Sequence, residues 1–345
     1  MFAEILKVIR LLGLRRAARL KRRHEQGLTY VRGYTATCCW WALLTSGFLD
    51  ALQQAGRLEA PRFAAHQRWN PAVLEAILTY LDGIGLLRRE GAWVALTPAG
   101  RVLLAEPRGL LELAWAYEPP LANLDALLRG DKQYGRDLQR RITYVGLGSG
   151  RLCEQLPYRV MRRMVLAQEC KVVLDLGCGD LAFLAGLCRA DPTIRCHGLD
   201  QSAEMVEFDR RQLQQHDFGG RLSVQQGDMF ACPELPVGVS SVDCITACDT
   251  FHEYLPDAAK IAGLMRGLKE RFPSAVFVIG EFCRQDPAWL RRRRTASLEH
   301  HLWHELSGQQ IGAARQWRDI FRQAALHLVA EDVYDLIGHG YFTLR

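Results

Sequence analysis

Apolar residues recur at helical spacing along most of the chain up to about residue 165. The clearest case is the segment 71–83, which predicts a helix that ends near two glycines. Residues 86–97 then predict a β-hairpin around Glu90 and Gly91. Helices followed by such a hairpin are typical of a winged-helix plan, so we expect a mainly helical, winged-helix-like domain in the first part of the chain.

The pattern changes at about residue 171, where short apolar runs that predict strands begin to alternate with helical segments. The segment 326–344 predicts two further strands joined by a turn near Gly338. Strands that alternate with helices favour an α/β domain with a largely parallel sheet. Residues 106–165 are helical in pattern and connect the two halves.

Composition narrows the cellular setting. Hydrophobic residues make up 49% of the 345 positions, which is enough for a core in two domains. No run of eighteen uncharged apolar residues and no secretory signal is evident, so we expect neither a membrane span nor export. The eleven cysteines form no C-x-x-C pair and are expected to be buried free thiols in a reducing cytoplasm.

The net charge of +6 is unevenly distributed. Cations crowd an amphipathic first helix: Lys7, Arg10, Arg15, Arg16, Arg19, Lys21, Arg22 and Arg23. Such a helix can lie on an anionic membrane, but we favour a terminal helix that docks on a partner subunit. A second basic run, Arg291–Arg294, predicts a solvated helix start rather than a nucleic-acid site.

A glycine-rich turn follows the first apolar run of the α/β half. The stretch 172–180 contains Gly177 and Gly179, which let a ligand approach the backbone, and Asp200 ends the next apolar run. A dinucleotide would place its pyrophosphate at this turn. Because Asp175 and Asp180 would repel a pyrophosphate, the pattern favours a cationic ligand: a sulfonium with an ammonium group, S-adenosylmethionine.

From these residues the chain resembles the class I S-adenosylmethionine-dependent methyltransferases, over about residues 140–345. The matching segments are 175–180, Asp200, 226–229, 242–249 and 277–281. The resemblance implies these cofactor-binding residues, with Asp200 on the ribose and Asp228 facing the adenine amine: Asp175, Gly177, Gly179, Asp200, Gln201, Asp228, Met229 and Cys248. Leu181 is a departure, because many members carry a third glycine there.

The resemblance also implies an architecture. The expected fold class is α/β, with a Rossmann-like, doubly wound, mixed seven-stranded sheet. We expect a winged-helix-like dimerisation domain over 1–110, a helical connector and pocket cover over 111–165, and a catalytic domain over 166–345. The presumed recognition helix near 71–83 carries Glu75 and Asp82 but no Lys or Arg. DNA phosphates require cations, so a homodimer is expected and a nucleic-acid partner is not.

Histidines supply the candidate chemistry. His252 and Glu253 follow the presumed fourth strand, and His304 lies in a later helical segment. There His300 and His304 are four residues apart and share a helix face. Imidazole serves as a general base near neutral pH or as a ligand of iron or zinc.

A closer resemblance is to phenylpyruvate and other α-keto acid C-methyltransferases of antibiotic pathways. His252, His304, Gly308 and Trp317 match in order. In the phenylpyruvate enzymes two histidines hold an iron that chelates the keto acid. The resemblance therefore implies C-methylation of an α-keto acid or aromatic precursor in natural product biosynthesis, with His252, His304 and Glu253 catalytic and with His252 and His304 as ligands of iron or zinc.

Two other functions remain open from the sequence. One is a metal-free O- or N-methyltransferase that uses His252 as general base on a phenol or amine. The other is a non-enzymatic winged-helix regulator that binds DNA and senses S-adenosylmethionine.

Overall fold

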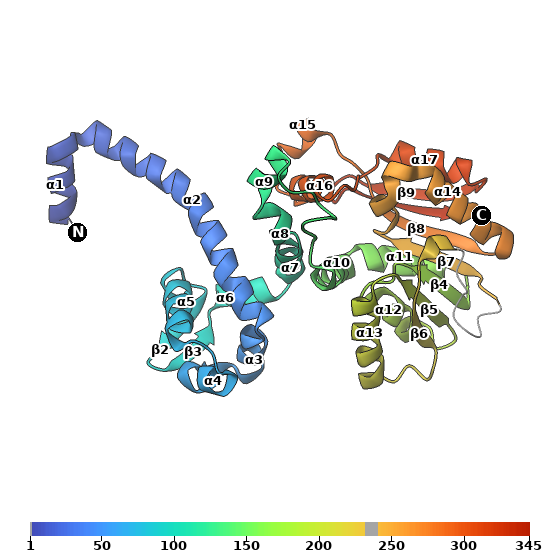
Figure 1. Ribbon diagram of the computed structural model, residues 1–345, viewed down its shortest axis with the longest axis horizontal. Helices are drawn as coiled ribbons and strands as arrows, with labels where there is room; N and C mark the ends of the chain where they lie inside the picture. Colours follow the sequence, from blue (N-terminus) through green and yellow to red (C-terminus); the bar gives the residue numbers. More distant parts are fainter. Residues whose placement is uncertain (1, 232–240) are drawn as a thin grey trace. The chain divides into compact units, whose positions relative to one another are not determined.

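A computed structural model describes residues 2–231 and 241–345 (Figure 1). The chain divides into two compact units, Met1–Ala105 and Glu106–Arg345. The segment 111–165, which was predicted as a separate connector, is part of the second unit. No helix in the described ranges combines the length and the apolar character needed to cross a membrane.

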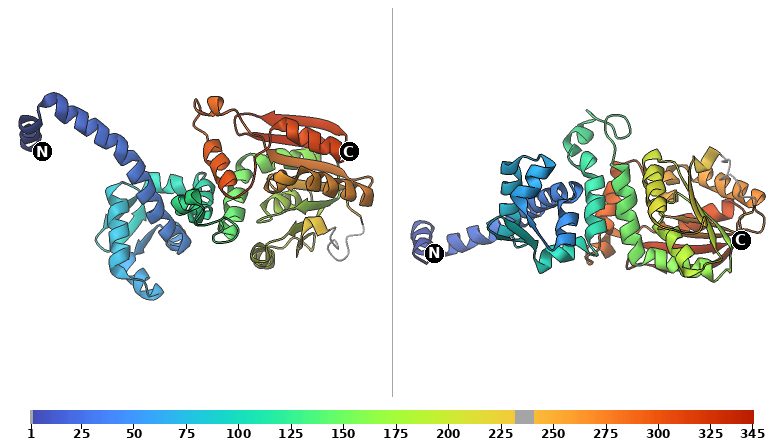
Figure 2. Two further views of the ribbon diagram at one scale, coloured as in Figure 1. Left: turned by 45° about the horizontal axis from the view of Figure 1, so that its top comes forward. Right: turned by 90° about the horizontal axis from the view of Figure 1, so that it is seen from below.

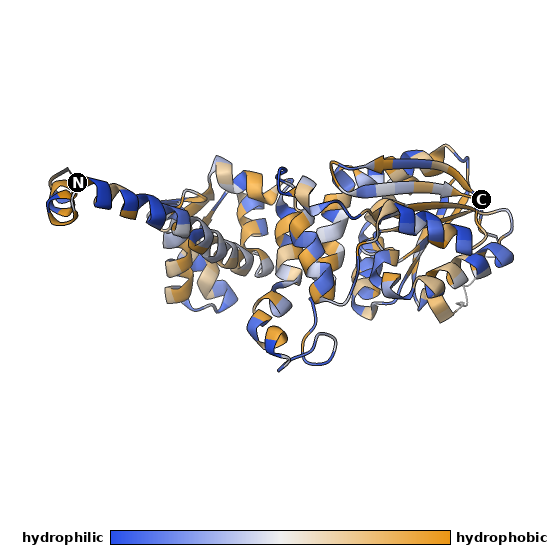
Figure 3. Cartoon of the chain, turned by 90° about the horizontal axis from the view of Figure 1, so that it is seen from above, coloured by the Kyte–Doolittle hydropathy of each residue, from blue (hydrophilic) through white to orange (hydrophobic). Residues whose placement is uncertain are grey.

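The first unit begins with two helices where the sequence predicted one. Helix α1 covers Phe2–Leu12 and α2 covers Leu14–Thr45. They are separated by Gly13, whose φ of 74° is a left-handed conformation that ends a regular helix. The first half of α2 is mostly hydrophilic (Figure 3), and apolar residues on both helices are exposed, among them Leu11 and Leu14.

The rest of this unit has the element order of a winged helix (Figure 1). Helices α3 (Phe48–Ala55), α4 (Ala60–Gln67), α5 (Pro71–Gly83) and α6 (Pro98–Leu104) surround strands β1 (Arg57–Glu59), β2 (Leu87–Glu90) and β3 (Trp93–Leu96). The strands form one antiparallel sheet in the order β1-β3-β2. Asn70 caps α5, and Glu75 on that helix accepts two hydrogen bonds from the guanidinium of Arg89.

The second unit opens with helices that stand beside the sheet: α7 (Arg108–Ala116), α8 (Glu118–Leu121), α9 (Leu124–Arg129), α10 (Ile142–Gln155) and α11 (Pro157–Leu166). Helices α7 and α10 cross closely because each has a glycine at the contact. A Cβ on Gly109 would lie 2.8 Å from the carbonyl oxygen of Gly148. This crossing brings α10 against the catalytic half, where it lines the candidate site.

The sheet has seven strands in the order β6-β5-β4-β7-β8-β10-β9. They are β4 (Val172–Leu176), β5 (Arg195–Asp200), β6 (Leu222–Gln226), β7 (Cys244–Cys248), β8 (Val276–Phe282), β9 (Leu328–Tyr334) and β10 (His339–Leu344). All neighbours are parallel except β10, which is antiparallel to β8 and β9. The predicted mixed seven-stranded α/β fold is therefore confirmed.

Helices cover both faces of this sheet (Figures 1 and 2), and an apolar core lies on each face. Side chains alternate along each strand, so Leu174 joins one core and Val173 the other. Helices α14 (Ala258–Arg271) and α17 (Ala314–Gln323) contribute to the first core, and α11 and α12 (Ala182–Ala190) to the second. The remaining elements are α13 (Ala203–Gln215), α15 (Pro287–Leu290), α16 (Ser297–Leu306) and the 3-10 turns η1 (Met229–Ala231) and η2 (Phe251–Asp257).

Two smaller expectations can be compared with this unit. The run Arg291–Arg294 is exposed, but it follows the short helix α15 and does not start a helix. The ten cysteines that the structure describes are free thiols, most of them buried, and Cys232 lies outside the described residues.

Candidate active site

The chain order reverses beside β4, because β5 lies on one side of it and β7 on the other. Such a reversal opens a crevice at the carboxyl ends of parallel strands. Gly177 and Gly179 turn here with φ of 69° and 55°. A Cβ on Gly177 would lie 2.7 Å from Oγ1 of Thr250, so the turn has room only for glycine.

A pocket occupies this crevice. Six of the eight cofactor residues predicted from sequence line it: Gly177, Gly179, Asp200, Gln201, Met229 and Cys248. Asp200 is fixed by the turn itself, since its two oxygens accept hydrogen bonds from the backbone N–H groups of Gly179 (3.1 Å) and Ser202 (2.8 Å). The carboxylate is thereby held at the end of β5, where a ribose would need it.

The other two predicted residues, Asp175 and Asp228, are not among the lining residues. Asp175 is buried beneath the turn, where its Oδ1 accepts a hydrogen bond of 2.6 Å from Thr246, and burial raises its pKa to about 7. Asp228 is exposed and accepts a hydrogen bond from the backbone N–H of Phe230. Their roles as cofactor ligands stay predictions.

The negative charge of the pocket does not come from Asp175 and Asp180, on which the prediction of a cationic ligand rested. Its lining carboxylates are Asp200, Asp249 and Glu253, and Arg140 is the one cation among the described lining residues. Asp180 lies outside the lining, and burial raises its pKa to about 6. An excess of acids still suits a cationic ligand.

Leu181 occupies the position at which many class I methyltransferases carry a glycine. Its φ is 57°, in the left-handed region that leucine rarely adopts. The side chain is nevertheless 3% exposed and packs in the core beside Cys178 and Phe183. Burial of this leucine offsets the strain of its backbone.

Two histidines meet beside this pocket, from different elements. His252 lies on η2 and His304 on α16, and their Nε2 atoms are 3.1 Å apart. The Nδ1 of His252 lies 3.0 Å from Oε2 of Glu281, and the Nδ1 of His304 lies 2.6 Å from the carbonyl oxygen of His300. Each ring is therefore held through Nδ1 while its Nε2 faces the other ring.

The two rings differ in their affinity for a proton. Burial alone would lower the pKa of His252, but the charge and hydrogen bond of Glu281 raise it above the ordinary value. Burial, reinforced by the positive charge of His252, lowers the pKa of His304 far below that value. A proton shared by the pair therefore resides on His252.

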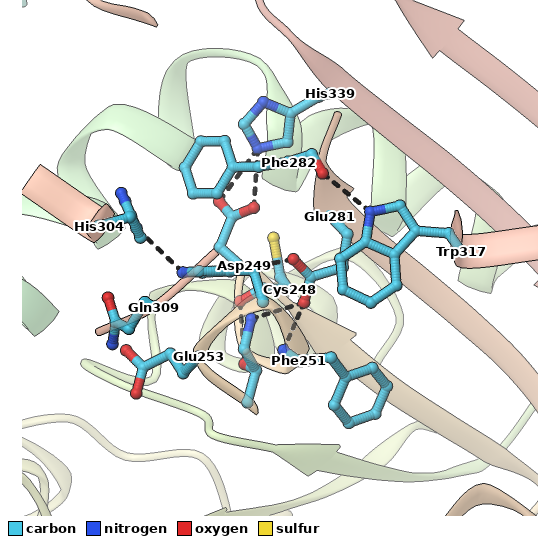
Figure 4. A network of polar contacts seen from close by, with 12 residues as sticks. Cys248, Asp249, Phe251, Glu253, Glu281, Phe282, His304, Gln309, Trp317 and His339 are labelled. Atoms are coloured by element: carbon cyan, nitrogen blue, oxygen red, sulfur yellow. Dashed lines mark hydrogen bonds and ion pairs between the residues drawn. The ribbon is translucent and has the colours of Figure 1, made fainter. Parts of the chain in front are cut away.

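Glu281 is the residue that sequence reasoning missed. Its side chain is fully buried at the end of β8, and its Oε1 accepts hydrogen bonds from the backbone N–H groups of Thr250 and Phe251 (Figure 4). It thus fixes both the His252 ring and the turn that carries it. A carboxylate inside the apolar run 276–282 was the signal available in the sequence.

Glu253, predicted as catalytic, is not the partner of His252. It forms an ion pair with Arg140, whose guanidinium also bonds the hydroxyl of Tyr117 and Oε1 of Gln309. This network lies at the edge of the cofactor pocket, which Arg140 and Glu253 both line.

Gly308 and Trp317 are the other two positions that match the α-keto acid C-methyltransferases, and both have structural roles. Gly308 follows α16 with a φ of 70°, which suits a helix end. The indole N–H of Trp317 donates to the carbonyl oxygen of Phe282, at the end of β8 (Figure 4). Gly308 therefore ends the helix that carries His304, and Trp317 joins α17 to the end of β8, next to Glu281.

A second acid–imidazole pair lies nearby. Asp249 follows β7 with a φ of 52°, and Nε2 of His339 donates to its two oxygens at 2.8 and 3.1 Å (Figure 4). Cys153 donates to the same carboxylate at 3.2 Å. Cys153, Cys248 and Asp249 form the one group of three or more metal-capable side chains found among the described residues.

Comparisons with known proteins agree with this geometry. Residues 168–324 match a family model described as a methyltransferase domain. A 2-ketoarginine methyltransferase of Streptomyces arginensis is 26% identical over 322 residues, which cover 90% of each chain. An O-methyltransferase family protein from Burkholderia thailandensis has a similar solved structure, with 16% identity, a TM-score of 0.65 and coverage of 93% of this chain and 97% of the other.

Human N-acetylserotonin methyltransferase, solved with S-adenosylmethionine, is similar in fold at 17% identity, with a TM-score of 0.64 and coverage of 94% of this chain and 97% of the other. The matched methyltransferase domain, the strand order of the sheet and the position of the pocket beside β4 all indicate the same type of fold. The chain therefore contains a methyltransferase domain with the fold of the class I S-adenosylmethionine-dependent methyltransferases.

Proposed function

We propose that this methyltransferase transfers the methyl group to the carbon next to the ketone of a small α-keto acid, in a pathway of secondary metabolism. His252 and His304 are the residues to which we assign the activation of the acceptor. The observation that carries the proposal is the pair of Nε2 atoms that face each other at 3.1 Å.

Hydrogen bonding fixes the tautomers of the two rings. A carbonyl oxygen only accepts, so the Nδ1 of His304 donates to His300 and the Nε2 of a neutral His304 carries a lone pair. The Nδ1 of His252 likewise donates to the Glu281 carboxylate. Two neutral rings would thus point lone pairs at each other, and the arrangement is stable only with a proton or a metal cation between them.

The pair fits a metal such as iron or zinc. Metal–imidazole bonds are about 2.0–2.2 Å long, so one ion can contact both atoms across such a gap. Metal-bound histidines usually donate their second N–H to a carboxylate or a carbonyl oxygen, as Glu281 and His300 accept here. When bound, the metal would act as a Lewis acid on the ketone and carboxylate oxygens of the acceptor.

The protein's own residues would orient the acceptor. Arg140 brings a cation to the edge of the pocket, and its ion pair with Glu253 fixes the position of its guanidinium. The buried rings of His252 and His304 are 3% and 6% exposed, so bulk water is kept from the proton that the acceptor carbon must lose. The acceptor carbon would lose its proton to a base in the site, its electron pair would form the new bond to the methyl carbon, and the bond between methyl and sulfur would break to release the demethylated cofactor.

Similarity supports the substrate class. The name of the Streptomyces arginensis relative gives it 2-ketoarginine, which is an α-keto acid, as substrate. Its 26% identity extends over nine tenths of both chains, so it includes the helices before the sheet as well as the sheet itself.

A second candidate is metal-free O- or N-methylation with His252 as general base. The 3.0 Å contact between His252 and the buried Glu281 favours it, because a carboxylate behind an imidazole orients the ring and stabilises its protonated form.

One assay separates the two candidates. Purified enzyme is incubated with S-adenosylmethionine and panels of α-keto acids, phenols and amines, with and without added iron or zinc, and the demethylated cofactor is quantified. Turnover of keto acids that depends on metal and is lost in both His252→Ala and His304→Ala supports C-methylation. Turnover of phenols or amines alone, without metal, overturns it.

We also propose that the enzyme is a cytoplasmic homodimer built through residues 1–110. The exposed apolar residues of α1 and α2 support a protein partner at this region. Contact of the basic first helix with an anionic membrane is the less favoured use of the same segment.

A further inference from the structure

A second cavity lies next to the cofactor pocket, inside the unit Glu106–Arg345. Its volume is about 430 Å³, well above the space of a few water molecules. Its walls are largely apolar and come from α7, α10, α11, β8 and the β9–β10 turn: Leu113, Leu152, Leu156, Pro157, Phe282, Leu336 and Ile337. None of these side chains has a part in the cofactor site described above.

The two cavities meet at shared residues. Ser149, Cys153 and Asp249 line both of them. At the other end of the second cavity stand Leu336 and Leu156, which are 65% and 37% exposed. The cavity therefore reaches from exposed residues to a wall that it shares with the cofactor pocket, near the end of β7.

The second cavity holds no free negative charge. Asp249 is its one acid among the described lining residues, and both oxygens of that carboxylate already accept hydrogen bonds from His339 and Cys153. Arg294, at the exposed end, adds a positive charge.

We propose that this cavity holds an apolar tail of the methyl acceptor and selects against acceptors with a cationic tail, such as the guanidinium of 2-ketoarginine. The inference rests on the proposed function for the nature of the reacting head. The selection of the tail is argued from the apolar walls of the cavity, from the wall that it shares with the cofactor pocket, and from the absence of an unpaired acid among its described lining residues. A guanidinium placed here would lose its water and find no unpaired carboxylate, which is costly.

Two substitutions test the proposal with little risk to the fold. Leu336 is exposed, so Leu336→Glu places an acid at the cavity mouth; Leu298→Glu places one on an exposed position of α16 that does not line the cavity. Ala296→Trp narrows the cavity from the start of α16. The readout is kcat/KM for pyruvate, 4-methyl-2-oxopentanoate, phenylpyruvate and 2-ketoarginine, with cofactor affinity measured for each variant.

The enzyme is expected to prefer the two apolar-tailed acids over 2-ketoarginine by about tenfold or more. Ala296→Trp should lower kcat/KM for these two by about tenfold and leave pyruvate and cofactor affinity near wild type. Leu336→Glu, but not Leu298→Glu, should shift the preference toward 2-ketoarginine. A wild-type preference for 2-ketoarginine, or equal losses for all acceptors in Ala296→Trp, overturns the inference.

Failure of the proposed function gives a different result. If phenols or amines are methylated and keto acids are not, the same variants are assayed with phenols and amines that carry short or long apolar tails. Discrimination by tail length in Ala296→Trp then supports the cavity assignment while C-methylation is rejected. Loss of discrimination rejects the cavity assignment as well.

Discussion

The Nε2 atoms of His252 and His304 lie 3.1 Å apart although 52 positions separate the residues in sequence. The contact joins a turn after the fourth strand of the sheet to a helix before the last two strands. The Nδ1 of His252 is held by Glu281, and the Nδ1 of His304 is held by the carbonyl oxygen of His300. The proposed activation of the methyl acceptor requires these two rings to lie next to each other.

The first prediction concerns metal content. Protein purified and then loaded with iron or zinc should retain about one ion per chain, because two oriented imidazoles supply part of a metal site. His252→Ala and His304→Ala should each lose it, as measured by elemental analysis. His301→Ala is the matched control on the same helix and should retain the ion. Retention in the first two variants would remove the histidines from any metal site.

The second prediction concerns pH. Glu281 raises the pKa of His252, and below that pKa a proton blocks Nε2 of His252. Activity should therefore fall as pH drops through a pKa above the ordinary histidine value. Glu281→Gln removes the charge and keeps one oxygen for the backbone hydrogen bonds, but its NH2 group then faces Nδ1 of His252 and shifts the proton of the neutral ring to Nε2. The pKa of His252 should therefore fall, the acid limb of kcat/KM should move to lower pH, and the maximal rate should drop.

The control for this pH profile is Glu305→Gln, which removes an exposed carboxylate of α16 that pairs with Arg284. Its acid limb should coincide with that of the wild type. An unchanged limb in Glu281→Gln would show that His252 does not govern the profile.

The third prediction concerns the cofactor. Asp200→Ala should weaken binding of S-adenosylmethionine by about 1–3 kcal/mol in calorimetry, the usual cost of removing a buried polar partner. Asp217→Ala, in the turn that precedes β6, is the control and should bind normally, since Asp217 bonds the backbone of Gly219 away from the pocket. Equal affinity in wild type and Asp200→Ala would contradict the assignment of the ribose acid.

The fourth prediction concerns assembly. Light scattering at micromolar concentration should give twice the chain mass of 39.0 kDa. Removal of residues 1–34, which leaves the buried Trp40 in place, should lower that mass to the mass of a monomer if the exposed apolar residues of α1 and α2 form the interface. A monomeric full-length chain, or tight binding to duplex DNA with a steep dependence on salt, would contradict the dimer platform.

Much of the fold follows from local sequence patterns. The helix 71–83, the hairpin after it and the last strand pair are set by apolar spacing and turn residues that are close in sequence. The break at Gly13 was not predicted, because a lone glycine inside a helical pattern is often tolerated and only its φ of 74° shows that the helix ends.

The candidate site was less accessible to sequence reasoning. Motif order located the glycine turn and Asp200, but the partner of His252 is Glu281 and not the adjacent Glu253. Such a pairing depends on the register of β7 and β8 in three dimensions. The pair Asp249–His339 joins residues 90 positions apart and carries no local signal.

C-methylation is tested most directly by identifying the atom to which the transferred methyl group is bound in the product. The enzyme is supplied with S-adenosylmethionine labelled with carbon-13 at the methyl group and with an apolar α-keto acid, and the product is examined by carbon-13 NMR. We expect a labelled methyl group bound to the carbon beside the ketone, and we expect no such product from His252→Ala. A labelled methyl on oxygen or nitrogen, from a keto acid or from a phenol or amine in the same assay, would contradict it.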